Sequence, residues 1–161
     1  MKKIALLFSA CLFFTLYSFA QVQEGDIKVF QQLFGTEKMA LVKEYMALTP
    51  QQDSLFWDDY KIYEDARLEL GKRRIKLVDN YANSIMTLSA DKATELVNES
   101  NAIDTEFKKL QKTYYKKMSK KIGEVKAAQF YQFESYINNL INLSIQENIP
   151  FVGEVEMMYK K

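Results

Sequence analysis

Hydrophobic residues recur every three or four positions along most of the chain, the spacing of helices that bury one face. The most regular stripe lies in residues 89–122 and consists of Ala93, Leu96, Ile103, Phe107, Leu110, Tyr114, Met118 and Ile122. Spacings of three, four and seven are typical of a coiled-coil-like seam. No segment combines a sustained period of two with turn residues, so the pattern predicts an all-α fold.

The stripes predict four helices, at about residues 26–46, 50–87, 89–122 and 124–148. The first should be interrupted near Gly35 and has an apolar face at Met39, Leu41, Val42, Tyr45 and Met46. Pro150 should end the fourth helix and leave residues 151–161 as a short tail. Because the second and third helices are long and joined near Leu88, we expect an antiparallel helical hairpin to dominate the fold. Its stripes can be covered by the other helices or by a second copy of the chain, as in a homodimer.

The second and third helices each begin with a capping signal. Thr49 is placed as the N-cap of the second helix, with Pro50 at the first helical position and Gln52 completing a capping box. In Leu88-Ser89-Ala90-Asp91-Lys92, Ser89 is the expected N-cap of the third helix and Asp91 adds negative charge to its first turn.

Residues 1–20, MKKIALLFSACLFFTLYSFA, have the pattern of a secretory signal peptide. Two lysines precede an apolar stretch, and Ser18-Phe19-Ala20 forms a small-x-small cleavage site before Gln21. The apolar run is shorter than the ~20 residues that a transmembrane helix needs, which disfavours an anchor. A lipid on Cys11 would leave too short an apolar stretch before it. We therefore expect one helical domain, residues 21–161, in the periplasm or outside the cell.

Composition excludes several kinds of chemistry. The chain has no histidine, and its single cysteine, Cys11, lies in the expected signal peptide. The commonest zinc and copper sites and nucleophilic triads therefore cannot form, and we predict no catalytic residues, metal or cofactor. Without Lys2 and Lys3 the chain has 20 basic and 21 acidic side chains, a net charge of −1 that argues against nucleic acid as a partner.

Carboxylates are paired at Asp58-Asp59 and Glu64-Asp65, with Glu69 close behind. Paired carboxylates can act as acid and base or bind hard cations. Arg67, Lys72, Arg73 and Arg74 follow at helical spacings that allow ion pairs. We therefore expect a solvated salt-bridge face rather than an active site.

The strongest local charge lies in KKLQKTYYKKMSKK, residues 108–121, which holds seven lysines. The candidate partner-binding surface consists of Lys108, Lys109, Lys112, Tyr114, Tyr115, Lys116, Lys117, Lys120 and Lys121. Lysines also favour a helix C-terminus and solubilise an exposed face, which is the simpler explanation. As a functional surface, this segment would suit an acidic or aggregation-prone polypeptide, or make weak contact with an anionic membrane.

Leu48-Thr49-Pro50-Gln51-Gln52 resembles the L-T-x-x-Q signature of Spy/CpxP-like periplasmic proteins, and Leu88-Ser89 begins a degenerate second copy. The run from Phe56 to Glu64, the run from Lys126 to Glu134, and Ile149-Pro150 are similar to a broader, uncharacterised branch of exported bacterial helical proteins. The family motif residues are Leu48, Thr49, Gln52, Leu88 and Ser89. Together these features cover about residues 46–150.

The resemblance implies an ATP-independent chaperone or envelope-stress modulator, a cradle-shaped helical dimer with a basic, partly apolar concave face. The lysine-rich segment is the candidate for that face. The leading hypothesis is therefore a non-enzymatic envelope protein that binds other polypeptides. The alternative is a dedicated interaction or sensor protein for one membrane or sigma-regulatory partner.

Overall fold

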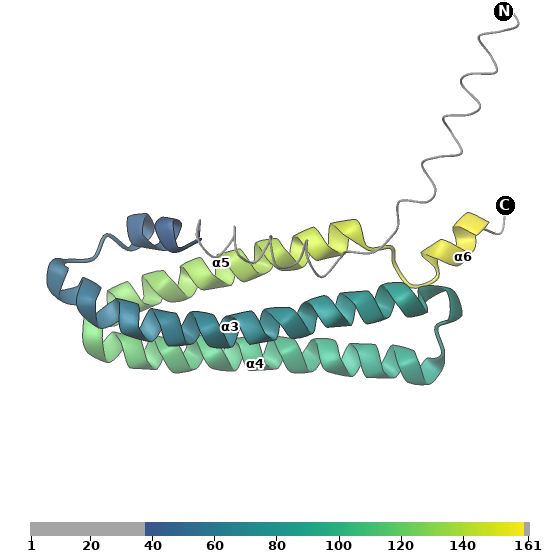
Figure 1. Cartoon of the computed structure of the whole chain (residues 1–161), viewed down its shortest axis with the longest axis horizontal. Helices are drawn as coiled ribbons and strands as arrows, with labels where there is room; N and C mark the ends of the chain where they lie inside the picture. The colour runs from purple at the N-terminus through teal and green to yellow at the C-terminus, as the bar shows by residue number, and fades with distance from the viewer. Residues whose placement is uncertain (1–37, 160–161) are drawn as a thin grey trace, which may run out of the picture.

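The computed structural model describes residues 38–159, and within this range every regular element is helical (Figure 1). Residues 38–46 are helical and are called here helix 38–46; they are followed by α3 (Pro50–Ser84), the 3₁₀ turn η1 (Ile85–Thr87), α4 (Ala90–Ile122), α5 (Glu124–Asn148) and α6 (Glu154–Tyr159). The predicted all-α class is confirmed. The expected signal peptide, Gly35 and most of the first predicted helix lie outside the described residues.

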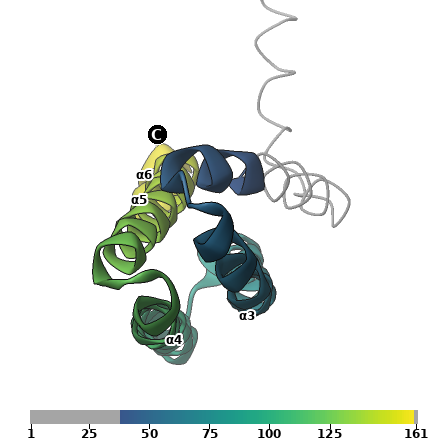
Figure 2. The ribbon, with the colours of Figure 1, turned by 90° about the vertical axis from the view of Figure 1, so that its left-hand side faces the viewer.

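The three long helices lie side by side, with α4 in contact with both α3 and α5. The chain reverses at η1 and again at Gly123, so α3 and α4 are antiparallel and α5 returns along α4. Helix 38–46 lies over the end of the bundle where α3 begins and α4 ends (Figure 2). Its last turn is held by α5, because Gln129 Nε2 donates to Tyr45 O at 2.5 Å and Lys126 Nζ donates to Met46 O.

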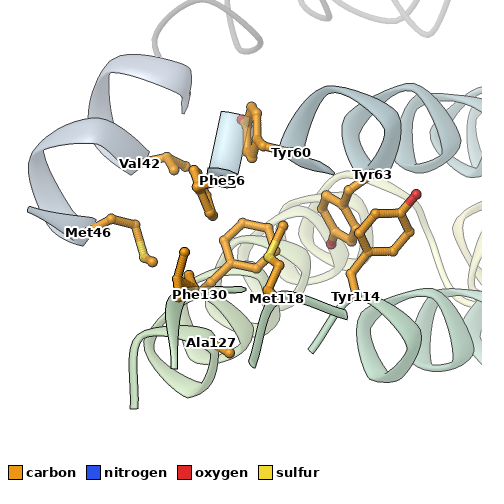
Figure 3. Close-up of a cluster of buried hydrophobic side chains, with 10 residues drawn as sticks. Val42, Met46, Phe56, Tyr60, Tyr63, Tyr114, Met118, Ala127 and Phe130 are labelled. Carbon is orange, nitrogen blue, oxygen red and sulfur yellow. The ribbon is translucent and has the colours of Figure 1, made fainter. Parts of the chain in front are cut away.

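An aromatic core fills this end of the bundle (Figure 3). Its buried members are Val42, Met46, Phe56, Tyr60, Tyr63, Tyr114, Met118, Ile122, Ala127 and Phe130. The Phe130 ring packs edge-on against Phe56 at 5.4 Å and against Tyr63 at 5.2 Å between ring centroids. A smaller cluster of Leu70, Ile103 and Phe107 lies farther along the hairpin.

The structure refines two sequence-based expectations about the ends of the domain. Of the five residues expected on the apolar face of helix 38–46, only Val42 and Met46 are buried, while Met39, Leu41 and Tyr45 stay about half exposed. Where one side of a helix packs on the bundle, residues on its other sides remain exposed. The expected tail also contains α6, whose six residues are too few to show a periodicity. Tyr81 Oη donates to Pro150 O at 2.7 Å and ties this region to α3.

Candidate functional site

The motif at Leu48–Gln52 is a capping box, as predicted, and also makes a tertiary contact. Gln52 N donates to the Thr49 hydroxyl at 3.3 Å, and Thr49 N donates back to Gln52 Oε1 at 3.2 Å. The other half of the same carboxamide reaches α4, where Nε2 donates to Ile122 O at 2.9 Å. Ile122 is the last residue of α4, and its carbonyl lacks an intrahelical partner. Gln52 thus joins the start of α3 to the end of α4.

This double role predicts that Gln52→Glu destabilises the protein by about 1–2 kcal/mol, because a carboxylate can complete the capping box but cannot donate to Ile122 O. Urea unfolding followed by circular dichroism measures the change. Gln51→Glu is the matched control, since it places the same charge in the same exposed first turn. Equal stability of the two variants would show that the contact to α4 contributes nothing.

The second motif lies at the opposite end of α3. Ser89 caps α4 by accepting from Lys92 N at 3.2 Å, as predicted, but Lys92 cannot accept a return bond and pairs instead with Glu95. At 1.5 Å per residue, the 35 residues of α3 separate the two motifs by about 50 Å. The motif residues therefore belong to two helix starts rather than to one site.

The candidate partner-binding surface divides among three sides of α4. Tyr114 is buried in the aromatic core, and Lys117 and Lys121 point to α3, where they pair with Asp59. Lys108, Lys112 and Tyr115 line a groove against α5. The remaining members are exposed and do not line that groove: Lys109, Lys116 and Lys120. The candidate residues therefore do not share one face of α4, because consecutive residues of a helix point in different directions.

The paired carboxylates also depart from the expected solvated face. Asp58, Asp65 and Glu69 are exposed, as predicted, whereas Asp59 is only 2% exposed. Its two carboxylate oxygens lie 2.8 Å from Lys117 Nζ and 2.9 Å from Lys121 Nζ. Burial raises the pKa of the Asp59 carboxyl, but the hydrogen bonds and charges of the two lysines outweigh burial and leave the pKa below its ordinary value.

Glu64 belongs to a buried ionic network around Lys38. Lys38 Nζ lies 2.6 Å from Glu64 and 2.8 Å from Glu134, and both Lys38 and Glu134 are 1% exposed. Tyr63 Oη donates to Glu134 at 2.8 Å, and Arg67 Nε donates to Glu64 at 2.9 Å. The network thus connects helix 38–46, α3 and α5. Buried charges are tolerated only when paired in this way.

The network predicts loss of stability in acid. Burial raises the pKa of Glu64, but hydrogen bonds and charges from Arg67 and Lys38 lower it below the ordinary value of 4.5. A carboxyl with a lowered native pKa stabilises the fold fully above its unfolded value, and this contribution is lost as pH falls through the native value. We expect the melting temperature to fall below about pH 4.5, and to fall less steeply in Glu64→Gln. Glu69→Gln, at an exposed ion pair, should leave the slope unchanged; an equal flattening in both variants would contradict the assignment.

An open groove of about 820 Å³ lies between α4 and α5 and is called here the α4–α5 groove. From α4 it is lined by Asp104, Phe107, Lys108, Gln111, Lys112 and Tyr115. The lining from α5 is mostly carboxamide and hydroxyl side chains: Ala128, Tyr131, Gln132, Ser135, Asn138, Asn139 and Asn142. The groove therefore combines two lysines, two tyrosines and many groups that both donate and accept hydrogen bonds.

Sequence reasoning identified Lys108, Lys112 and Tyr115 but missed the α5 wall of the groove. Asn138, Asn139 and Asn142 lie in the interior of a helix, where asparagine is a poor choice on propensity alone. Their concentration in one helix was the available signal. Lys38 and Glu134 were missed because a contact between residues 96 positions apart leaves no local pattern.

No protein-family model, curated protein or solved structure matches this chain. Among residues 38–159, no helix is long and apolar enough to span a bilayer. Within the same range, no three acidic, histidine or cysteine side chains are grouped as metal ligands would be.

Proposed function

We propose that the protein is a non-enzymatic helical protein of the cell envelope that binds other polypeptides, as a chaperone or stress modulator of the Spy/CpxP-like kind. The observation that carries this proposal is the α4–α5 groove. Lys108, Lys112 and Tyr115, three members of the candidate partner-binding surface, contribute to a concave and amphiphilic site there. Such a surface can hold chain segments through charge, aromatic packing and hydrogen bonds without one required shape.

Support for the cellular location and family comes from the sequence. Residues 1–20 have the composition of an export signal, and the L-T-x-x-Q signature is the basis for the family resemblance. The helical starts at Thr49 and Ser89 agree with that signature, although a capping box also occurs in unrelated helices.

The test is suppression of aggregation. The protein, expressed as residues 1–161 and purified after any processing by the host cell, is added in several-fold excess to a client protein that aggregates when its disulfides are reduced. Light scattering at low salt should fall as the protein is added, because surface charge is least screened there. Scattering that does not change would refute chaperone activity.

The alternative, a dedicated interaction protein for one envelope partner, is favoured by the pairing of Lys117 and Lys121 with Asp59. These two lysines form ion pairs with a carboxylate of the same chain, so fewer unpaired lysines are available to clients than the sequence suggested. Pull-down from a cell-envelope extract distinguishes the two functions. One stoichiometric partner would support the alternative, whereas many weakly bound proteins would support a chaperone.

A further inference from the structure

The α4–α5 groove has an uncompensated positive charge. The lining side chains that are charged at neutral pH are Asp104, Lys108 and Lys112. The Asp104 carboxylate accepts from Arg74 Nη2 at 2.6 Å, so its charge is balanced inside the fold. Lys108 and Lys112 lie one helical turn apart, are exposed, and form no ion pair with another described residue. An occupant with negative charge would complement this pair.

Gln111 provides a second and independent sign of a ligand. This groove residue is 7% exposed, and its Nε2 has no hydrogen-bond partner within residues 38–159. A buried donor without a partner is energetically costly, and an acceptor on a ligand would remove that cost. Because Nε2 is a donor, the group that satisfies it must be an acceptor such as a carboxylate or carbonyl oxygen.

The opposite wall suits an extended backbone better than a helix. Asn138, Asn139 and Asn142 offer carboxamides along one wall, and Asn138 Oδ1 already accepts from Arg74 Nη1 at 2.9 Å. Carboxamides pair with free backbone N–H and C=O groups, which an extended segment presents and a helix keeps to itself. Tyr115 and Tyr131, packed edge to face at 6.3 Å between centroids, add an aromatic surface for side chains or backbone.

We propose that the α4–α5 groove binds an extended, acidic segment of a polypeptide, with carboxylates on Lys108 and Lys112 and an oxygen acceptor on Gln111. This inference rests on the proposed polypeptide-binding function and names the chemistry of the segment that is bound. It assigns binding to one groove of α4 rather than to the whole lysine-rich segment.

The first experiment measures binding of a fluorescent peptide in which Glu alternates with Ser and Thr. The protein, expressed and purified as above, should bind this peptide, and binding should weaken as salt increases. A matched peptide with Gln in place of Glu should bind at least about tenfold more weakly, a difference of ~1.4 kcal/mol. Equal affinity for the two peptides would overturn the proposal.

Matched lysine variants locate the site. The double variant Lys108→Gln/Lys112→Gln should lower the affinity for the acidic peptide by about tenfold, as expected for losing two charged contacts. Lys109→Gln/Lys116→Gln removes the same charge from exposed positions of the same helix that do not line the groove, and should change affinity by no more than about twofold. Equal losses in both variants would show that the whole helix attracts the peptide and that the groove is not the site.

Gln111→Leu separates ligand binding from a structural role. Replacing a buried, unpartnered donor by an apolar side chain of similar size should leave the melting temperature unchanged or higher. The same substitution should lower the affinity for the acidic peptide by about three- to tenfold, because a hydrogen bond to the ligand is lost. A lower melting temperature with unchanged peptide affinity would overturn the role of Gln111.

The outcomes separate this inference from the proposed function. Suppressed client aggregation without acidic-peptide binding would overturn the groove assignment and leave the polypeptide-binding function standing. Peptide binding without client suppression would support the groove and refute a general chaperone. If the protein binds an anionic oligosaccharide but not the acidic peptide, the groove's occupant is not a polypeptide and the inference is overturned.

Discussion

Replacing Glu134 by alanine should lower the free energy of unfolding by about 3–5 kcal/mol, the range measured when one partner of a buried ion pair is removed. Glu134 and Lys38 are both 1% exposed, and the truncation would leave the Lys38 ammonium buried with Glu64 as its remaining carboxylate. The Tyr63 hydroxyl would also lose its acceptor. Urea unfolding monitored by circular dichroism gives the change directly.

Two controls show whether the loss comes from the buried charge. Glu69→Ala breaks the pair between Glu69 and Lys72, whose side chains are 69% and 58% exposed, and should change stability by at most about 1 kcal/mol. The double variant Lys38→Met/Glu134→Leu removes both buried charges and should recover much of the stability lost in Glu134→Ala. A double variant no more stable than the single one would indicate lost packing instead of an unpaired charge.

Phe56→Ala should lower the free energy of unfolding by a comparable 3–5 kcal/mol, approximately the usual loss when a buried aromatic side chain is truncated. Phe56 is fully buried, and its ring contacts Trp57, Tyr60 and Phe130 at centroid distances of 5.1, 5.6 and 5.4 Å. The truncation would leave a cavity where helix 38–46 meets the long helices (Figure 3). Thermal and urea unfolding should both report the loss.

Phe151→Ala is the matched control for Phe56→Ala, since the Phe151 side chain is 74% exposed and its removal opens no cavity. We expect a change within about 0.5 kcal/mol, as for most surface substitutions. Similar losses for the two variants would mean that the aromatic core does not supply the main packing at this end of the bundle.

The helical structure of the long elements and the starts of α3 and α4 could be predicted, because both depend on local interactions. Thr49 and Gln52 lie three residues apart, and such a pair before an apolar stripe is the sequence signature of a helix start. The periodicity through Ile103, Phe107, Tyr114 and Met118 also indicated the buried side of α4 correctly. The short α6 escaped prediction because six residues supply neither a stripe nor a strong cap.

The candidate site could be predicted only in part. Lys108 and Lys112 stood out by charge, but nothing in the sequence distinguished them from Lys117 and Lys121. The difference depends on which helix packs against each side of α4: Asp59 of α3 forms ion pairs with Lys117 and Lys121, and the carboxamides of α5 lie across the groove from the other two. Tertiary packing also decides the role of Glu64. The sequence pattern predicted a surface carboxylate, whereas in the fold Glu64 pairs with Lys38.

By itself, the sequence determined that most of residues 38–148 would form helices, where α3 and α4 begin, and which stripe of α4 is buried. These properties depend on hydrogen bonds and side-chain spacings within a few residues. Only the tertiary structure decided which charges are neutralised, because attraction between charges depends on distance and burial rather than on position in the sequence. Thus Lys38 and Glu134 meet across 96 positions, Gln52 reaches across to Ile122, and two of seven clustered lysines remain to line a groove.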